Sequence, residues 1–145
     1  MGKIGHKTEI RVIYADTDAM SVVYHSNYFK WFEVGRTELL RSIGFPYSRL
    51  EQEGVRLPVI ECGCKYIKPA VYDDLLAITT VIKEVKAASF VIEYEICRKD
   101  TGERLVTGFT RHAVTNHDLK PLRFKAAAPE LYNLLFNNDE SRSPE

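Results

Sequence analysis

The stretch that decides the fold runs from residue 28 to residue 43. It reads Tyr28-Phe29-Lys30-Trp31-Phe32-Glu33-Val34-Gly35-Arg36-Thr37-Glu38-Leu39-Leu40-Arg41-Ser42-Ile43. Its apolar residues recur at helical spacing, and either Ser26 or Asn27 in front of them is a good N-cap. Gly44 suits the position after the last turn, and Pro46 prevents the helix from continuing. The pattern predicts one helix, roughly 25 Å long at 1.5 Å per residue.

This predicted helix is apolar around most of its perimeter. One face carries Tyr28, Phe32, Gly35, Leu39 and Ile43, and that face is flanked by Phe29, Trp31 and Leu40. A helix of this kind is buried rather than laid on a surface. Gly35 costs about 1 kcal/mol of helix propensity relative to Ala, which close approach of a packing partner would justify. We therefore expect a central helix with other elements packed around it.

Segments with strand periodicity lie on both sides of the helix. One precedes it and four follow it: Thr8–Tyr14, Val59–Ile67, Leu75–Val85, Phe90–Arg98 and Arg104–Thr115. The turn at residues 100–103 is typical of a hairpin, so the sheet should be antiparallel. Smaller helices are expected at Pro46–Glu53 and Pro129–Phe136, followed by a frayed tail over residues 137–145. The order β-α-ββββ predicts a single α+β domain over residues 1–145, with a curved antiparallel sheet wrapped around the long helix.

Composition excludes several classes of function. Lys plus Arg and Asp plus Glu both number 20, so there is no basic excess to bind nucleic acid or an anionic membrane. No apolar run approaches the roughly 18 residues of a membrane span, and the N-terminus lacks the apolar core of a signal peptide. The three cysteines follow neither a disulfide framework nor zinc-ligand spacing. We expect a cytoplasmic protein without a nucleic-acid or membrane partner.

The segment between the first strand and the helix carries the candidate chemistry. Asp16 and Asp18 are two residues apart at the end of the strand, and the helix begins some eight residues later. An Asp-x-Asp pair alone is most often a turn, since Asp bonds its own backbone there. A helix N-terminus, however, offers free N–H groups and a positive dipole end to an anionic oxygen. A carboxylate base or nucleophile beside such a site is the minimum equipment for acyl transfer.

The same segment resembles the hotdog-fold thioesterases of the 4-hydroxybenzoyl-CoA thioesterase-like group, in particular the YbgC-type acyl-CoA thioesterases. The matching residues extend over almost the whole chain. They are Tyr14-x-Asp16-Thr17-Asp18, Val22-Val23-Tyr24-His25-x-Asn27-Tyr28, Glu33-x-x-Arg36, Tyr66-x-x-Pro69-Ala70, Asp73-Asp74-Leu75-Leu76, Ser89-Phe90 and Lys120-Pro121. The resemblance implies a hotdog fold and hydrolysis of an acyl-CoA thioester to free acid and CoA.

The resemblance also implies a role for each matched residue. Asp18 corresponds to the catalytic carboxylate, acting as nucleophile or as general base on water. The backbone N–H of His25 corresponds to the donor that polarises the thioester carbonyl. Tyr24 and the His25 side chain should line the acyl end of the site. Asp16 should brace the turn, and Asn27 should either cap the helix or support the substrate site.

Three further positions bear on the site. Lys86 and Ser89 are both expected to bind the substrate, and Lys86 is the favoured contact for the CoA phosphates, ahead of Lys65, Lys68, Arg98 and Lys99. Relatives commonly have Gly where Ser21 stands, so a positive φ there would strain the loop. Glu33 is expected to pair with Arg36 on the helix rather than act as a second catalytic acid.

Two other functions remain open at this stage. A hotdog hydratase or dehydratase would use a His base, for which His25 is available, and a non-catalytic acyl-CoA-binding module would need no acid at residue 18. The resemblance implies a homo-oligomer, dimer or tetramer, with active sites between subunits, and of the two we expect the tetramer. An acyl-carrier protein is a possible alternative thioester donor. The scattered histidines lack metal-ligand spacing, so neither a metal nor any other cofactor is expected.

Overall fold

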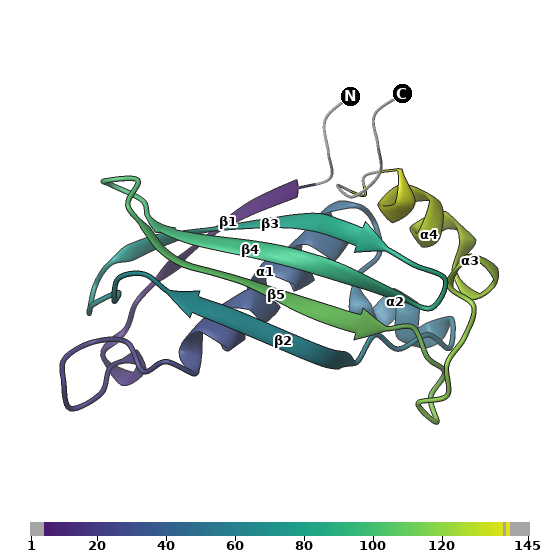
Figure 1. Cartoon of the computed structure of the whole chain (residues 1–145), viewed down its shortest axis with the longest axis horizontal. Helices are drawn as coiled ribbons and strands as arrows, with labels where there is room; N and C mark the ends of the chain where they lie inside the picture. Colours follow the sequence, from purple (N-terminus) through teal and green to yellow (C-terminus); the bar gives the residue numbers. More distant parts are fainter. Residues whose placement is uncertain (1–4, 138, 140–145) are drawn as a thin grey trace.

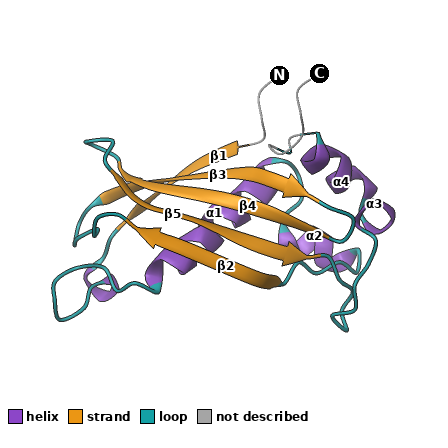
Figure 2. Ribbon diagram, in the orientation of Figure 1, coloured by secondary structure: helices purple, strands orange, loops and turns teal. Residues whose placement is uncertain are grey.

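The computed structural model describes residues 5–137 and 139 of the chain. A five-stranded antiparallel sheet packs with one face against a long helix, α1 (Figures 1 and 2). In chain order the elements are β1 Gly5–Arg11, the 3-10 turn η1 Tyr14–Asp16, α1 Asn27–Ser42, α2 Tyr47–Gln52, β2 Val59–Tyr66, β3 Leu75–Val85, β4 Ser89–Arg98, β5 Arg104–Ala113, α3 Phe124–Ala127 and α4 Pro129–Phe136. The predicted fold class and the β-α-ββββ order are confirmed.

The strands lie in the order β1-β3-β4-β5-β2, so β1 and β2 form the two edges. Hairpins join β3 to β4 and β4 to β5, whereas β1 and β2 reach their places through longer connections. Among the described residues, this arrangement leaves the outer side of β2 without a paired strand. All but two of its residues are exposed, Val59 and Ile60 among them. An exposed edge strand of this length is a template for pairing with another chain.

The first strand ends earlier than the sequence predicts. We expected it to continue to Tyr14, but β1 stops at Arg11. The Asp16 carboxylate accepts the backbone N–H of Ile13 at 3.0 Å, and the Asp16 N–H bonds back to the Ile13 carbonyl. These two bonds turn the chain out of the sheet. The helix α3 was also not predicted, because four residues carry too little periodicity to mark it.

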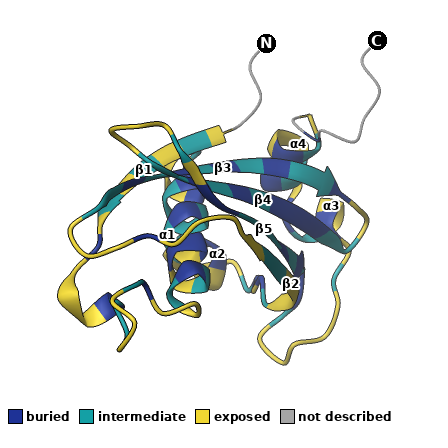
Figure 3. Ribbon diagram, turned by 60° about the vertical axis from the view of Figure 1, so that its left-hand side comes forward, coloured by how far each residue is buried: buried dark blue, intermediate teal, exposed yellow. Residues whose placement is uncertain are grey.

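The core lies between α1 and the sheet. Buried positions alternate along β3, β4 and β5, and they face the buried side of α1 (Figure 3). Gly35 lies at a close contact between the helix and the sheet, since a Cβ at Gly35 would be 2.4 Å from Thr80 Oγ1. The close approach predicted from this glycine is therefore confirmed. On the same helix, Arg36 lies 3.9 Å from Glu33, the expected intrahelical pair.

A chain of polar groups crosses this apolar core. The Tyr94 hydroxyl bonds to Thr110 Oγ1 at 2.7 Å, and Thr110 Oγ1 bonds to His112 Nε2 at 2.8 Å. His112 Nδ1 is 2.9 Å from the Leu57 carbonyl, which can only accept, so Nδ1 carries the proton. Arg36 is within hydrogen-bonding reach of the Tyr94 hydroxyl at the other end. Burial, aided by the charge of Arg36, lowers the pKa of His112 to about 4, so the ring is neutral at pH 7.

The C-terminal helices cover the far end of the sheet. α4 packs on β3, and the backbone N–H of Phe124 bonds to Ala87 in the β3–β4 turn. Of the expected tail at 137–145, residue 138 and residues 140–145 lie outside the described residues. Asp139 is described and is buried, with its carboxylate accepting the Val85 N–H at 2.7 Å.

Candidate active site

The loop from η1 to α1 is built around Asp16. Besides accepting the Ile13 N–H, its carboxylate pairs with Lys30 Nζ at 3.2 Å, and the residue is only 5% exposed. Its backbone carbonyl accepts the Tyr24 N–H at 2.8 Å and the Asn27 side-chain amide at 2.9 Å. Asp16 thus holds both ends of the loop together. These contacts support the bracing role expected for it.

Asp18 occupies the tip of the same loop. Its backbone N–H and carbonyl bond to Val22 and Ser21, which closes a tight turn, and its Oδ1 accepts the Met20 N–H at 2.8 Å. Within the described residues, Asp18 Oδ2 has no hydrogen-bond partner. Ser21 has φ of +65°, the left-handed conformation that favours Gly, so the strain anticipated at this position is present. The turn therefore engages one carboxylate oxygen of Asp18 and leaves the other without a partner in the described part of the chain.

The start of α1 presents free backbone donors. In the part of the chain that the structure describes, the backbone N–H of His25 has no acceptor. Tyr24 and His25 are both exposed, with their ring centroids 4.5 Å apart. Asn27 does not cap the helix, because its amide bonds to Asp16, and Ser26 forms no side-chain cap either. The Asn27 amide instead ties the helix start to the Asp16 carbonyl, and its support of the substrate site stays a prediction.

A small pocket adjoins this helix start. It has a volume of about 170 Å³ and is lined by Val23, His25, Tyr28, Tyr66, Ile67, Lys68 and Pro69. The Tyr66 hydroxyl lies 3.2 Å from the His25 carbonyl and donates to it. Desolvation, with a hydrogen bond to Cys64, raises the pKa of Tyr66 to about 12, which keeps this donor protonated. The sequence did not single out Tyr28 or Tyr66 as pocket residues, although both belong to the motif.

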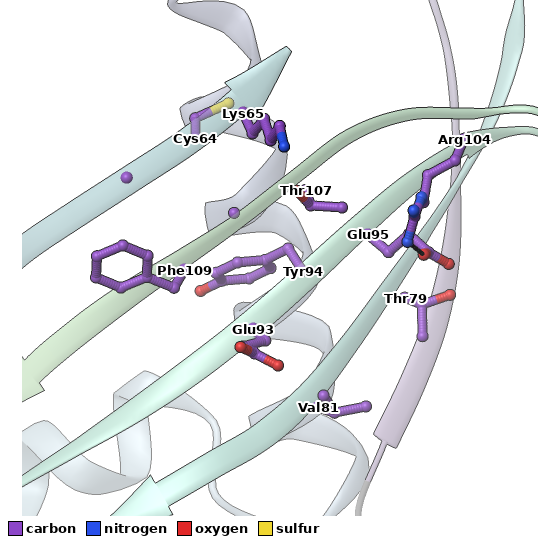
Figure 4. Close-up of a pocket in the computed structure, with 12 residues that line it drawn as sticks. Cys64, Lys65, Thr79, Val81, Glu93, Tyr94, Glu95, Arg104, Thr107 and Phe109 are labelled. Atoms are coloured by element: carbon purple, nitrogen blue, oxygen red, sulfur yellow. Dashed lines mark hydrogen bonds and ion pairs between the residues drawn. The ribbon is translucent and has the colours of Figure 1, made fainter. Parts of the chain in front are cut away.

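A larger depression lies over the strands, with a volume of about 650 Å³ (Figure 4). Several of its side chains alternate with the buried positions of β3, β4 and β5, among them Thr79, Val81, Glu93 and Phe109. None of Asp18, Tyr24 and His25 lines it. We therefore place the candidate site at the smaller pocket beside the helix start, where the acid-bearing loop is anchored.

Two predicted contacts do not meet the rest of the site within one chain. Lys86 and Ser89 flank the β3–β4 turn, at the end of the sheet covered by α3 and α4, whereas the Asp18 loop is at the opposite end (Figure 1). The loop is anchored before the start of β3, and β3 then runs for 11 residues towards Lys86. At about 3.3 Å per residue this separates the two ends by roughly 30 Å.

Other charged residues near the site are engaged with one another. Lys68 and Arg98 both pair with Glu103, and Lys99 pairs with Glu9. Over residues 5–137 and 139, no group of three or more His, Cys, Asp or Glu side chains is placed to hold a metal ion. No helix in this part of the chain has the length and hydrophobicity of a membrane span.

A curved antiparallel sheet around one central helix, with an acidic loop at the helix start, is the arrangement of a hotdog-fold enzyme. Comparison with known families agrees with this class. The chain belongs to the thioesterase superfamily, whose 4HBT family model matches residues 20–104.

Individual relatives extend the likeness over most of the chain. The chain is 38% identical over 125 residues to "Putative acyl-CoA thioesterase YneP" of Bacillus subtilis, and the match covers 86% of this chain and 90% of that protein. It is 39% identical over 95 residues to the acyl-CoA thioesterase YbgC of Haemophilus influenzae, covering 65% and 70% of the two chains. The crystal structure of a DHNA-CoA thioesterase from Staphylococcus aureus matches with a TM-score of 0.85 at 33% identity, covering 90% and 87%.

Proposed function

We propose that this protein is an acyl-CoA thioesterase that hydrolyses an acyl-CoA thioester to the free acid and CoA, with Asp18 as its catalytic carboxylate. The main support for this proposal is that a carboxylate oxygen and a backbone N–H, both without partners among the described residues, lie on one loop that Asp16 holds in place. Asp18 Oδ2 and the His25 N–H both lack partners within the described residues, and Asp16 ties together the chain on either side of them. A free carboxylate oxygen and a free N–H are the two groups that acyl transfer requires.

Two chemical routes use this pair of groups. In the first, Asp18 attacks the thioester carbonyl carbon and the C–S bond breaks, giving an acyl-aspartate anhydride and CoA thiolate. Water then cleaves the anhydride and restores the carboxylate. In the second, Asp18 takes a proton from water while the hydroxide attacks the same carbon, and collapse of the tetrahedral intermediate expels the thiolate, which is then protonated. In both routes the His25 N–H stabilises the oxyanion.

The pocket beside the helix start provides a place for the acyl group. Its walls include the Tyr28 ring and the Val23 and Pro69 side chains, which are largely apolar. Tyr66 holds the His25 carbonyl and so fixes the peptide unit next to the catalytic N–H. Tyr24 and the His25 ring lie at the entrance, where they can contact the acyl group. One relative is named for an aromatic acyl group, 4-hydroxybenzoyl-CoA thioesterase, whereas YbgC is named only as an acyl-CoA thioesterase, so the test uses several kinds of acyl group.

The separation of Lys86 and Ser89 from Asp18 favours an active site shared between two chains. The C-terminal end of β2 is next to His25, whereas its N-terminal end pairs with the end of β5 beside Ser89. If two β2 edges pair antiparallel, the partner's β3–β4 turn approaches the His25 end of the first chain. Lys86 and Ser89 of one protomer could then bind the CoA moiety whose thioester lies at Asp18 of its partner. We therefore include a homodimer in the proposal, from which a tetramer can be built.

The test is a panel of acyl-CoAs with short, long and aromatic acyl groups, together with the same acyl groups on an acyl-carrier protein. Release of free thiol with an equal amount of free acid is the expected result. Binding without thiol release would indicate an acyl-CoA-binding module. Hydration of an enoyl substrate with the thioester intact would indicate a hydratase using His25. Exhaustive EDTA treatment should leave hydrolysis unchanged, because neither route contains a metal-dependent step.

A further inference from the structure

Arg98, at the end of β4, connects two parts of the chain that are far apart in sequence. Its Nε and Nη2 lie 3.2 and 3.1 Å from Asp74 Oδ2, and Nη2 also donates to the Pro69 carbonyl at 3.3 Å. Its Nη1 pairs with Glu103 on the other side of the β4–β5 hairpin. The side chain is 20% exposed, and its bonds to Asp74 and Glu103 are partly buried. Arg98 thus clamps the segment between β2 and β3 to the hairpin.

The segment between β2 and β3 contains a turn that the Asp74 carboxylate stabilises. Asp74 Oδ2 accepts the Val71 N–H at 2.9 Å in addition to its contacts with Arg98, and the Asp74 N–H bonds to the Val71 carbonyl. Asp73, inside this turn, has φ of +72°. A left-handed Asp costs free energy, so the turn depends on the bonds around it.

The Asp18 loop is attached to this turn. The buried Ala70 accepts the Val23 N–H at 2.9 Å and donates its own N–H to the Tyr28 hydroxyl at 3.1 Å. Next to it, Val71 forms a β-bridge with Val22. The Val22 carbonyl in turn accepts the Asp18 N–H at 2.9 Å. Backbone hydrogen bonds therefore connect the turn to the Asp18 loop, and the Tyr28 hydroxyl adds a side-chain contact from the first turn of α1.

We propose that Arg98 is a positioning residue, which sets the place of Asp18 and of the His25 N–H through the Pro69–Asp74 turn without touching the substrate. This inference rests on the proposed function for the roles of Asp18 and His25. The planar guanidinium is suited to the task because it can donate to a carbonyl and to two carboxylates at once. An ammonium group on a flexible stem has no such fixed fork.

The structural half of the proposal is tested by amide hydrogen exchange, which requires no substrate. Arg98→Met keeps the apolar stem and removes the fork. Arg104→Met is the matched control, since Arg104 also pairs with a glutamate of the sheet, at 3.2 Å, but is 58% exposed. We expect the Val23 and Ala70 amides to exchange about tenfold faster or more in Arg98→Met, with the paired β3 and β4 amides unchanged. Unchanged exchange at Val23 and Ala70 would overturn the proposal.

The catalytic half is tested by steady-state kinetics on an acyl-CoA that the wild type hydrolyses. Arg98→Met should lower kcat by about tenfold to a hundredfold, the scale of a misplacement near 1 Å, with KM nearly constant. In an Asp18→Asn background the loss caused by Arg98→Met should be smaller than in the wild type, because the part of its effect that passes through Asp18 is already gone. An equal loss in both backgrounds, or a loss matched by Arg104→Met, would contradict a positioning role.

Arg98→Lys completes the set and also serves if Arg98→Met does not fold. It retains the charge but not the fork. We therefore expect faster amide exchange at Val23 and Ala70 and a lower kcat than in the wild type, with both values close to those of Arg98→Met where that variant folds. Wild-type behaviour of Arg98→Lys would show that the fork is not needed. If the wild type hydrolyses no thioester, the proposed function fails while the exchange experiment still decides whether Arg98 holds the loop.

Discussion

Gly35 of α1 faces Thr80 of β3 so closely that a Cβ on the glycine would lie 2.4 Å from Thr80 Oγ1. The hydroxyl of Thr80 is fully buried and has no hydrogen-bond partner among the described residues. The helix and the sheet can therefore touch here only because one residue lacks a side chain. This contact limits how closely α1, and with it the chain at His25 just before the helix, can lie against the sheet.

Gly35→Ala should destabilise the protein even though Ala has the better helix propensity. The gain of about 1 kcal/mol in propensity is outweighed by overpacking, which costs roughly 1–3 kcal/mol. Thr80→Ala removes the clashing hydroxyl and should recover part of the loss in the double variant. Denaturant unfolding of the four proteins in the cycle measures this coupling. Strictly additive effects would show that the two residues do not compete for the same space.

His112 predicts a defined pH dependence of stability. Its pKa is about 4 in the folded chain and 6.5 in the unfolded reference, so only the unfolded state binds a proton between these values. The contribution of neutral His112 to the unfolding free energy is therefore fully present above about pH 6.5. It is lost as the pH falls towards 4, by about 3 kcal/mol in all. In His112→Gln this part of the decline should be absent, whereas the exposed His117→Gln should retain it. Identical unfolding curves against pH in wild type and His112→Gln would refute the assignment.

The two carboxylates of the loop should respond differently to amide substitution. Asp16→Asn loses the ion pair with Lys30 and weakens the bond from the Ile13 N–H, so it should cost about 1–3 kcal/mol of unfolding free energy. Its effect on turnover should be smaller than that of Asp18→Asn. Thermal unfolding and kinetics on the same preparations compare the two. A stable but inactive Asp16→Asn beside an unstable but active Asp18→Asn would mean that the roles are exchanged.

The edge strand β2 should mediate self-association. Light scattering at micromolar concentration should give a multiple of the 16.6 kDa chain mass. Ile60→Lys, at an edge position that is 57% exposed, should shift the protein towards monomer and reduce activity, because charge on an edge opposes strand pairing. Leu119→Lys is the control, as Leu119 is 59% exposed on a loop outside the sheet. A wild-type monomer with full activity would eliminate the shared site.

Local patterns were sufficient for most of the fold. The helical spacing from Tyr28 onward, Gly44 and the turn at residues 100–103 predicted α1 and the β4–β5 hairpin. The motif likewise led to Asp16, Asp18 and His25, which the structure places on one loop. Their chemical roles stay predictions until activity is measured.

The features that could not be predicted from the sequence depend mostly on contacts between distant segments. Nothing local indicates that β2 pairs with β5, or that Lys86 is at the far end of the sheet from Asp18. The sequence offered Arg98 only as a contact for the CoA phosphates and gave His112 no role, because Asp74 and Leu57, which they bind, are tens of residues away. The early end of β1 was missed because a side-chain bond from Asp16 competed with the strand pattern.

The most direct test of the central claim is thiol release by Asp18→Asn, measured on the best acyl-CoA of the panel. The substitution preserves size and the bond to the Met20 N–H but removes the base or nucleophile. We predict that kcat falls by at least 10²–10⁴, about 3–5 kcal/mol of barrier, while the protein stays folded. Asp118→Asn, in a loop outside the candidate site, should retain full activity. An Asp18→Asn enzyme that keeps more than about a tenth of the wild-type rate, equivalent to only 1.4 kcal/mol, would contradict the account.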